Sequence, residues 1–358
     1  MALTSYTGAV WFLLLSLTCL AGDLGDAGVA VSPMYTGEAW TSSLGGFAHA
    51  GSADLQVTFL GEPLIDVQGL TVSFYGVANH SSGPQSLLGD GQYVSNVEAG
   101  NGFGLYEAWV EQVLGPMSLK LGIQELNNEF DVNEHGWLFL NSSQGMGAVL
   151  ANSGVNGPST FPVTGLTARA RLVVKDTSIS VAVSDGVPGD PVRSNFALRS
   201  ADGLFVISEA KTRVSGSQLA VGAWAYVPAG DRGAYTLVEV PLYRKDDVSE
   251  LDLSVRVGLG QTDNRFGGYT GAGLVWTGLI RGREHDAMGI AIGAVHTNAA
   301  ARGAGALPME VAVEATWQFE LTDWLWLQPD AQVVLNPDAD PNKPSGAVFA
   351  LRLIVAPI

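Results

Sequence analysis

Hydrophobic and polar residues alternate along most of this chain with a period of two. In residues 310–322 every second position from 311 to 321 is apolar, and the positions between carry Ala312, Glu314, Thr316, Gln318 and Glu320. Successive side chains of a β-strand point to opposite faces of a sheet, so this period indicates strands whose two faces meet different surroundings. The pattern recurs at 117–126, 177–185 and 250–260. We therefore predict an all-β fold.

The alternation predicts fifteen strands between residues 53 and 356, and the connections between them alternate in length. Short connections are Gly115-Pro116, Lys175-Asp176, Ser215-Gly216 and Thr322-Asp323, whereas long ones span 80–103, 127–162, 186–202 and 336–345. Short periplasmic turns and long extracellular loops are typical of bacterial outer-membrane barrels. An even strand count needs one more strand, for which Ser42 to Ala50 is the only candidate. Because lipid offers no hydrogen-bonding partner to an open edge, we expect a closed antiparallel transmembrane β-barrel of 16 strands.

Composition supports a membrane barrel over the alternative of a soluble two-sheet sandwich. Charged residues are 15% of the chain, against roughly 25% in ordinary soluble domains. The faces opposite the aliphatic stripes carry charges of both signs, which a membrane tolerates where they line water or form pairs. The formal net charge of −17 argues against nucleic acid as a partner, because phosphate binding needs a basic surface.

The N-terminus resembles an export signal. Ala9 to Ala21 form an apolar core, and small residues allow cleavage after Ala21 or after Ala30. No Lys or Arg precedes Lys120, so the usual basic start of such a signal is missing. We predict a signal peptide over residues 1–30 and a single barrel domain over 31–358. The one cysteine, Cys19, excludes a disulfide framework.

Several short segments also carry a family resemblance. They are SNVEAGNGFGLYEAWVEQ (95–112), FLNSSQG (139–145), WLWLQPDAQVVLNP (324–337) and AVFALRL (347–353). In this order they resemble the carbohydrate-selective outer-membrane porins of the OprB family, over roughly residues 40–356. The resemblance implies passive diffusion of sugars through a 16-stranded barrel in a Gram-negative outer membrane, with loops folded inward to narrow the channel. It implies small sugars, outer-membrane lipids and the barrel-assembly machinery as partners, and no cofactor.

A sugar presents hydroxyl groups and apolar C–H faces, so a selective pore needs aromatic rings and charged hydrogen-bonding groups at its narrowest point. Trp109 shares a strand face with Glu107 and Glu111, which makes it the best candidate for sugar contact; the alternative is that it packs against an inward loop. We hypothesise that Arg169, Arg171 and Glu107 lie at the constriction. The alternative is an ion-pair ladder that braces the wall. The candidate pore-lining residues are Glu107, Trp109, Glu111, Lys120, Arg169, Arg171, Glu209, Lys211, Arg213, Arg256, Glu314 and Arg352.

Other aromatic residues fit the membrane interface better than a ligand site. Trp324, Trp326 and Tyr243 lie near tight turns, where an aromatic belt is expected. The functional alternatives to a sugar channel are a general ion porin, a structural or adhesive barrel with a plugged lumen, and an outer-membrane hydrolase, for which the sequence gives no support.

No metal site or catalytic centre is predicted. Asp338, Asp340 and Asn342 alternate as at the start of a calcium loop, but the sharp-turn glycine and the distant glutamate are missing. We therefore expect a solvated extracellular loop. The five histidines show no metal-ligand spacing, and no catalytic fingerprint occurs. We expect neither a metal nor enzymatic activity.

Overall fold

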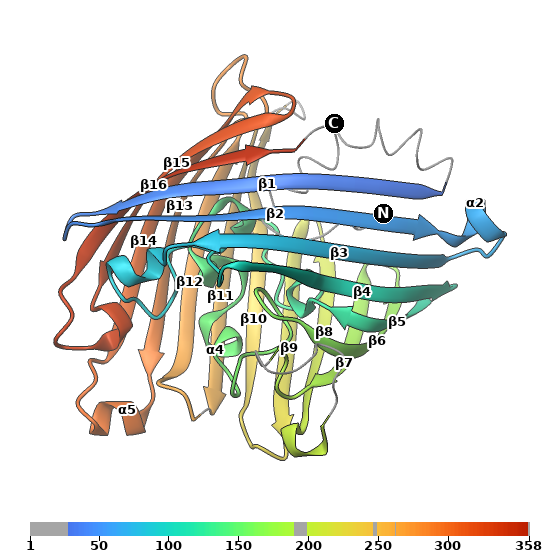
Figure 1. Cartoon of the computed structure of the whole chain (residues 1–358), viewed down its shortest axis with the longest axis horizontal. Coiled ribbons are helices and arrows are strands. Elements are labelled where there is room, and N and C mark those ends of the chain that lie inside the picture. The colour runs from blue at the N-terminus through green and yellow to red at the C-terminus, as the bar shows by residue number, and fades with distance from the viewer. Residues whose placement is uncertain (1–27, 190–198, 246–248, 262, 357–358) are drawn as a thin grey trace.

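The computed structural model describes residues 28–189, 199–245, 249–261 and 263–356. Within these residues it is a closed barrel of 16 strands (Figure 1). The strands are β1 Val29–Ser42, β2 Phe47–Leu60, β3 Leu70–Ser81, β4 Gly102–Leu114, β5 Met117–Gln124, β6 Gly165–Val174, β7 Thr177–Asp185, β8 Leu204–Val214, β9 Ser217–Val227, β10 Arg232–Lys245, β11 Ser249–Gln261, β12 Phe266–Thr277, β13 Ala287–Thr297, β14 Met309–Thr322, β15 Leu325–Leu335 and β16 Gly346–Val355.

The helices are short. They are α2 Gly61–Ile65, α3 Ser142–Gly145, α4 Ala148–Ala151 and α5 Ala299–Gly303, with 3-10 turns η1 Pro84–Leu87, η2 Leu126–Asn128, η3 Gly136–Leu138, η4 Ser200–Asp202 and η5 Pro337–Ala339. None of the helices in the described residues is long and apolar enough to cross a membrane.

Each strand pairs antiparallel with its neighbours in the sequence, and β1 pairs with β16 from Tyr35↔Val355 to Ser42↔Val348. The predicted closed barrel and its strand number are confirmed. The sixteenth strand was misplaced, however. The segment Ser42 to Ala50, expected to be one strand, instead contains the last residue of β1, the turn 43–46 and the start of β2. The chain turns there because Gly45 and Gly46 adopt φ of 93° and 98°, a left-handed conformation that glycine accepts at little cost.

The start of β1 bears on the predicted export signal, which otherwise falls on residues outside the described part of the chain. Val29 and Ala30 pair with Phe59 and Thr58 of β2. Cleavage after Ala30 would therefore remove two paired residues, whereas cleavage after Ala21 would leave β1 whole. The position of cleavage stays a prediction.

The two faces of the sheet differ as the alternation predicted. On β5, Leu119 and Leu121 are 49% and 55% exposed on the outside, while Lys120 between them is 6% exposed on the inside. Aliphatic side chains cover the exterior of the other strands in the same way, and most buried polar side chains point into the barrel. An apolar exterior of this kind is what hydrocarbon requires.

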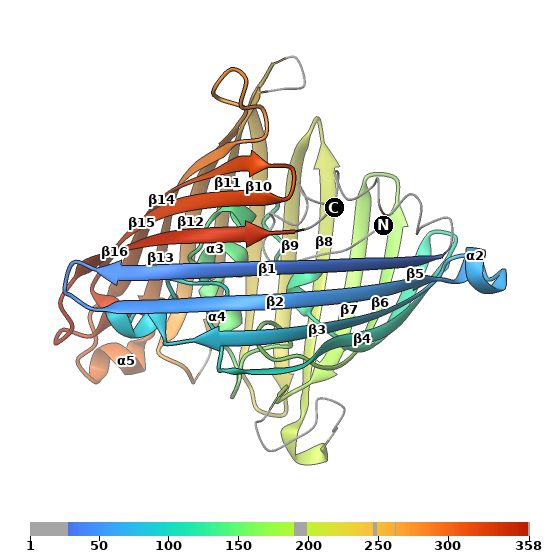
Figure 2. The same cartoon turned by 45° about the horizontal axis from the view of Figure 1, so that its top comes forward.

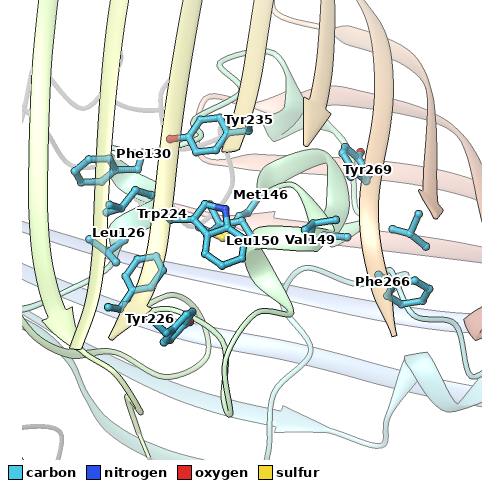
Figure 3. Packing of buried hydrophobic residues seen from close by; sticks show 14 of the residues in the cluster. Leu126, Phe130, Met146, Val149, Leu150, Trp224, Tyr226, Tyr235, Phe266 and Tyr269 are labelled. Carbon is cyan, nitrogen blue, oxygen red and sulfur yellow. The ribbon is translucent and has the colours of Figure 1, made fainter. Parts of the chain in front are cut away.

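The connections also follow the predicted asymmetry, with exceptions. Long connections span 82–101, named L2, and 125–164, named L3, together with 186–203 and 336–345. The links 43–46 and 228–231 on the same rim are short, and the turn 278–286 on the opposite rim is longer than expected. L3, with α3 and α4, lies inside the barrel (Figure 2). It packs there on side chains of β7–β10, β12 and β13; Figure 3 shows part of this packing.

Candidate functional site in the barrel interior

L3 and the inner wall carry opposite charges that meet in pairs. L3 contains four acidic residues and no Lys or Arg. Glu129, Asp131 and Glu134 form ion pairs with bases on the wall. These pairs are Glu129 with Lys120 (3.3 Å) and Arg169 (2.5 Å), Asp131 with Arg256 (2.8 Å), and Glu134 with Arg213 (2.5 Å). Four of the predicted pore-lining bases therefore hold the loop.

Glutamates of the wall hold the backbone of the same loop. A buried carboxylate needs hydrogen-bond donors, and free backbone N–H groups supply them. The carboxylates accept from L3 as follows: Glu107 from Glu125 N (2.7 Å), Glu209 from Asp131 N (2.9 Å), Glu239 from His135 N (3.1 Å), and Glu314 from Asn141 N (3.2 Å) and Leu140 N. Three predicted pore-lining acids, Glu107, Glu209 and Glu314, are thus anchors for L3.

Arg352 joins the barrel seam to L2. Its Nε lies 2.7 Å from Glu38 Oε1 across the β1–β16 pairing, and its Nη2 donates to Asn96 of L2. The other oxygen of Glu38 accepts from Ser95 of L2 (2.6 Å) and from Trp40 (2.8 Å). The predicted lumen residue Arg352 is buried, and it binds the first strand, the last strand and L2 together.

Trp109 is enclosed within the same region. Its indole is 7% exposed, and its Nε1 lies 3.5 Å from Glu107 Oε2. The Nζ of Lys120 stands 4.0 Å from the centre of the Trp109 ring, a cation–π distance. This cation occupies one face of the ring and favours the packing alternative. Sugar contact by Trp109 stays a prediction.

The remaining candidates keep some solvent access. The side chains of Arg213, Glu111 and Lys211 are 58%, 21% and 17% exposed. Arg169 is held by Glu111 at 2.7 Å as well as by Glu129. Arg171, two residues along β6, is partly exposed and lies opposite Ser118 and Ser180. It makes no ion pair within the described residues.

The aromatic belt needs one correction. Tyr243 and Trp324 are 44% and 45% exposed, so they remain candidates for the membrane interface. Trp326 is 8% exposed and packs with Ile354 and Ala356, so its placement in the belt was wrong. It shares a strand face with Gln328, Asp330 and Gln332, all of which are buried, and this polar face points inward.

Two features of the interior were missed from the sequence. His135 of L3 has its Nε2 3.7 Å from Asp252 and 3.9 Å from Glu239. Wall glycines make room for the loops: a Cβ on Gly289 would lie 2.8 Å from the Phe139 ring, and one on Gly293 would lie 3.0 Å from Ser143. Glycines at inward positions of β12 and β13 were the available signal.

No group of three or more His, Cys, Asp or Glu side chains is arranged to hold a metal ion in the described part of the chain. In the loop 336–345, Asp338 forms ion pairs with Arg265 (2.8 Å) and Lys343 (3.2 Å). The calcium-like spacing noted in this loop thus includes a carboxylate that pairs with basic side chains.

Asp131 should give the barrel a measurable pH dependence. Burial raises its pKa from 3.8 to about 6, although Arg256 opposes the rise. A raised pKa contributes stability that is present below pH 3.8 and lost as the pH rises through about 6. On acidification from pH 7 to pH 4, wild type should gain up to about 3 kcal/mol in unfolding free energy relative to Asp131→Asn. Thermal unfolding of both proteins across this range checks the difference, and parallel pH profiles would contradict it.

The comparisons with known proteins agree with this geometry. A model of the carbohydrate-selective porin OprB family matches residues 46–227 and 219–356. The high-pH structure of Pseudomonas putida OprB is similar, with 15% identity, a TM-score of 0.80, and coverage of 95% of this chain and 97% of that one. Its low-pH structure has 15% identity, a TM-score of 0.62 and coverage of 95% and 96%. A variant of the Rh. blastica porin has 11% identity, a TM-score of 0.58 and coverage of 92% and 99%.

No curated protein sequence matches the chain. The distant structural likenesses show the fold, and the family model spans most of the chain. Family and fold are those of channels rather than enzymes, they imply a Gram-negative outer membrane, and they favour transport over a structural or adhesive barrel. The chain belongs to the OprB family of carbohydrate-selective porins.

Proposed function

We propose that sugars diffuse passively past the inner faces of β4–β8, beside L3, and that Arg171 contacts them at the constriction. One observation carries this proposal: Arg171 is partly exposed and has no acidic partner among the described residues, whereas its neighbour Arg169 is held by Glu111 and Glu129. An unpaired guanidinium keeps its donors for sugar hydroxyls. The contact is weak enough to permit release, as transport requires.

The neighbouring charges fit the same path. Lys211 lies 3.7 Å from Glu209, and Glu111 and Lys211 both retain solvent access. Together with Arg171 they present donors and acceptors on β4, β6 and β8, which suits a neutral polyol better than an ion of one sign. Arg169 belongs to the anchor of L3 in this scheme and does not touch the sugar.

The test is sugar block of single-channel current in planar bilayers. Arg171→Ala should weaken the block by about tenfold or more, because a hydrogen bond from a charged group contributes roughly 1.5–3 kcal/mol. The exposed Arg302 of α5 supplies a matched control, and Arg302→Ala should leave the block unchanged. If Arg171→Ala blocks like wild type while the channel remains open, Arg171 is not a sugar contact and the chain acts there as a general porin.

The proposal extends to export and membrane contact. Residues 1–30 would direct the chain through the inner membrane, and the barrel-assembly machinery would insert it into the outer membrane. The exposed rings of Tyr243 and Trp324 would lie at the lipid headgroups. Mass spectrometry of the mature N-terminus would test the cleavage site.

A further inference from the structure

We propose that Arg256 is a positioning residue that fixes L3 against the wall and so sets the largest sugar that can pass. The inference rests on the proposed path beside L3, but it concerns the size of the passage rather than affinity for sugar. Arg256 projects from the middle of β11 into the barrel and is 2% exposed, so it touches protein only.

Arg256 grips two separate segments of L3. Its Nη2 donates to the carbonyl oxygens of Asp131 (2.8 Å) and Gly145 (2.9 Å), and its Nη1 donates to those of Ser143 (3.1 Å) and Gln144 (3.2 Å). Its Nε forms the ion pair with the Asp131 carboxylate. The rigid fork of a guanidinium can make these contacts together, whereas a lysine ammonium cannot.

Asp131 connects the same two segments from within L3. Its second carboxylate oxygen accepts from Gly147 N at 2.7 Å, which ties the two segments of L3 to each other. Its own N–H donates to Glu209 (2.9 Å) and lies 3.0 Å from the Tyr235 hydroxyl. Asp131 is therefore fixed to β8 and β10 through its backbone N–H and to β11 through its ion pair with Arg256.

Gly147 shows how closely the parts fit. A Cβ at this position would lie 3.1 Å from Arg256 Cδ and 3.2 Å from Asp131 Oδ2. Both distances are shorter than ordinary van der Waals contacts. An alanine at this position would therefore push Arg256 and Asp131 apart from Gly147 while keeping both charges. Gly147→Ala is therefore a second, independent way to move L3.

Apolar side chains of L3 next to these contacts also hold the loop against the wall. Phe130, Met146 and Leu150 of L3 belong to one buried cluster with Trp224 and other wall residues of β7–β10, β12 and β13 (Figure 3). Lifting L3 as a whole would expose this cluster as well as break the contacts of Arg256. Removing Arg256 alone should instead leave the loop in place but loosely held, with a wider distribution of positions.

The experiment compares liposome swelling rates for a mono-, a di- and a trisaccharide. In Arg256→Ala the trisaccharide rate relative to the monosaccharide rate should rise several-fold, because L3 no longer holds one position. The ratio for Arg256→Lys should lie between those of wild type and Arg256→Ala. Lysine keeps the positive charge opposite Asp131 but lacks the branched guanidinium that donates to several carbonyl oxygens. Arg302→Ala should match wild type. An unchanged ratio in Arg256→Ala would overturn the proposal.

Folding is checked by the heat-dependent mobility of the barrel on gels. If Arg256→Ala yields no folded barrel, Gly147→Ala decides: a changed size ratio supports the proposal and an unchanged ratio overturns it. Arg171→Ala separates this inference from the proposed sugar contact, because it should alter sugar block and leave the size ratio as in wild type. Failure of one measurement therefore does not imply failure of the other.

Discussion

Replacing Gly289 with valine is expected to lower single-channel conductance strongly and to slow the entry of every sugar. Gly289 lies on β13 under L3, and a Cβ there would come within 2.8 Å of the Leu138 and Phe139 side chains. Both side chains are fully buried, with 0% exposure, so they have little room to yield. Overpacking a site of this kind costs about 1–3 kcal/mol. L3 can relieve it by shifting away from the wall, toward the passage.

The direction of the change in passage size distinguishes Gly289→Val from Arg256→Ala. Gly289→Val fills the space between β13 and L3 and should narrow the passage. Arg256→Ala instead loosens L3 and should admit larger sugars. Gly104→Val is the matched control, because Gly104 is an exposed β4 glycine whose added Cβ would meet nothing within 4 Å. Conductance in planar bilayers measures all three variants. A Gly289→Val channel that conducts as well as the control would show that L3 does not border the passage.

Much of the fold was predictable because hydrocarbon outside and polar groups inside impose a period of two on each strand. The pattern placed fifteen strands and a closed sheet. It missed β1 because Pro33 and Gly37 interrupt its alternation and because its first residues follow an apolar segment typical of export signals. The glycine pair at 45 and 46, assigned to a strand, was in fact the signal for a turn.

The sequence predicted which residues lie on the inner face of the barrel, but it did not predict which residues they contact there. Alternation alone put Glu107, Arg169 and Arg256 on the inside, where the structure has them. Their partners lie in L3, and Arg256 meets the carbonyl oxygen of a residue 125 positions away. No local pattern encodes such a contact, because it depends on how an irregular loop folds back into the barrel.

The contacts with L3 change the role that we assign to the inward charges. A row of inward charges suggested a water-filled lumen or a bracing ladder. Four bases of this row instead pair with acids of L3, and three of its acids accept hydrogen bonds from the L3 backbone. These seven groups therefore position L3, and the partly exposed charges at and near Arg171 keep the solvent access that a sugar contact needs. The same argument explains why Trp326, on the inward face with Gln328, is not in the lipid belt.

The seam of the barrel should be the most sensitive site for stability. Glu38 and Arg352 join β1 to β16, and their side chains are 0% and 1% exposed. Removing one partner of a buried ion pair costs roughly 3–5 kcal/mol, because the other charge is left buried and uncompensated. Glu38→Ala should lower the unfolding free energy by about this amount, and more if the freed Ser95 of L2 also detaches.

Urea unfolding in lipid vesicles, followed by tryptophan fluorescence, measures this loss. Glu62→Ala, at an exposed position of α2, is the matched control and should stay within about 0.5 kcal/mol of wild type. The double variant Glu38→Ala with Arg352→Met should recover part of the loss, because the uncompensated guanidinium is gone. If Glu38→Ala unfolds like the Glu62 control, the ion pair does not hold the seam, and the backbone pairing of β1 with β16 is sufficient to close the barrel.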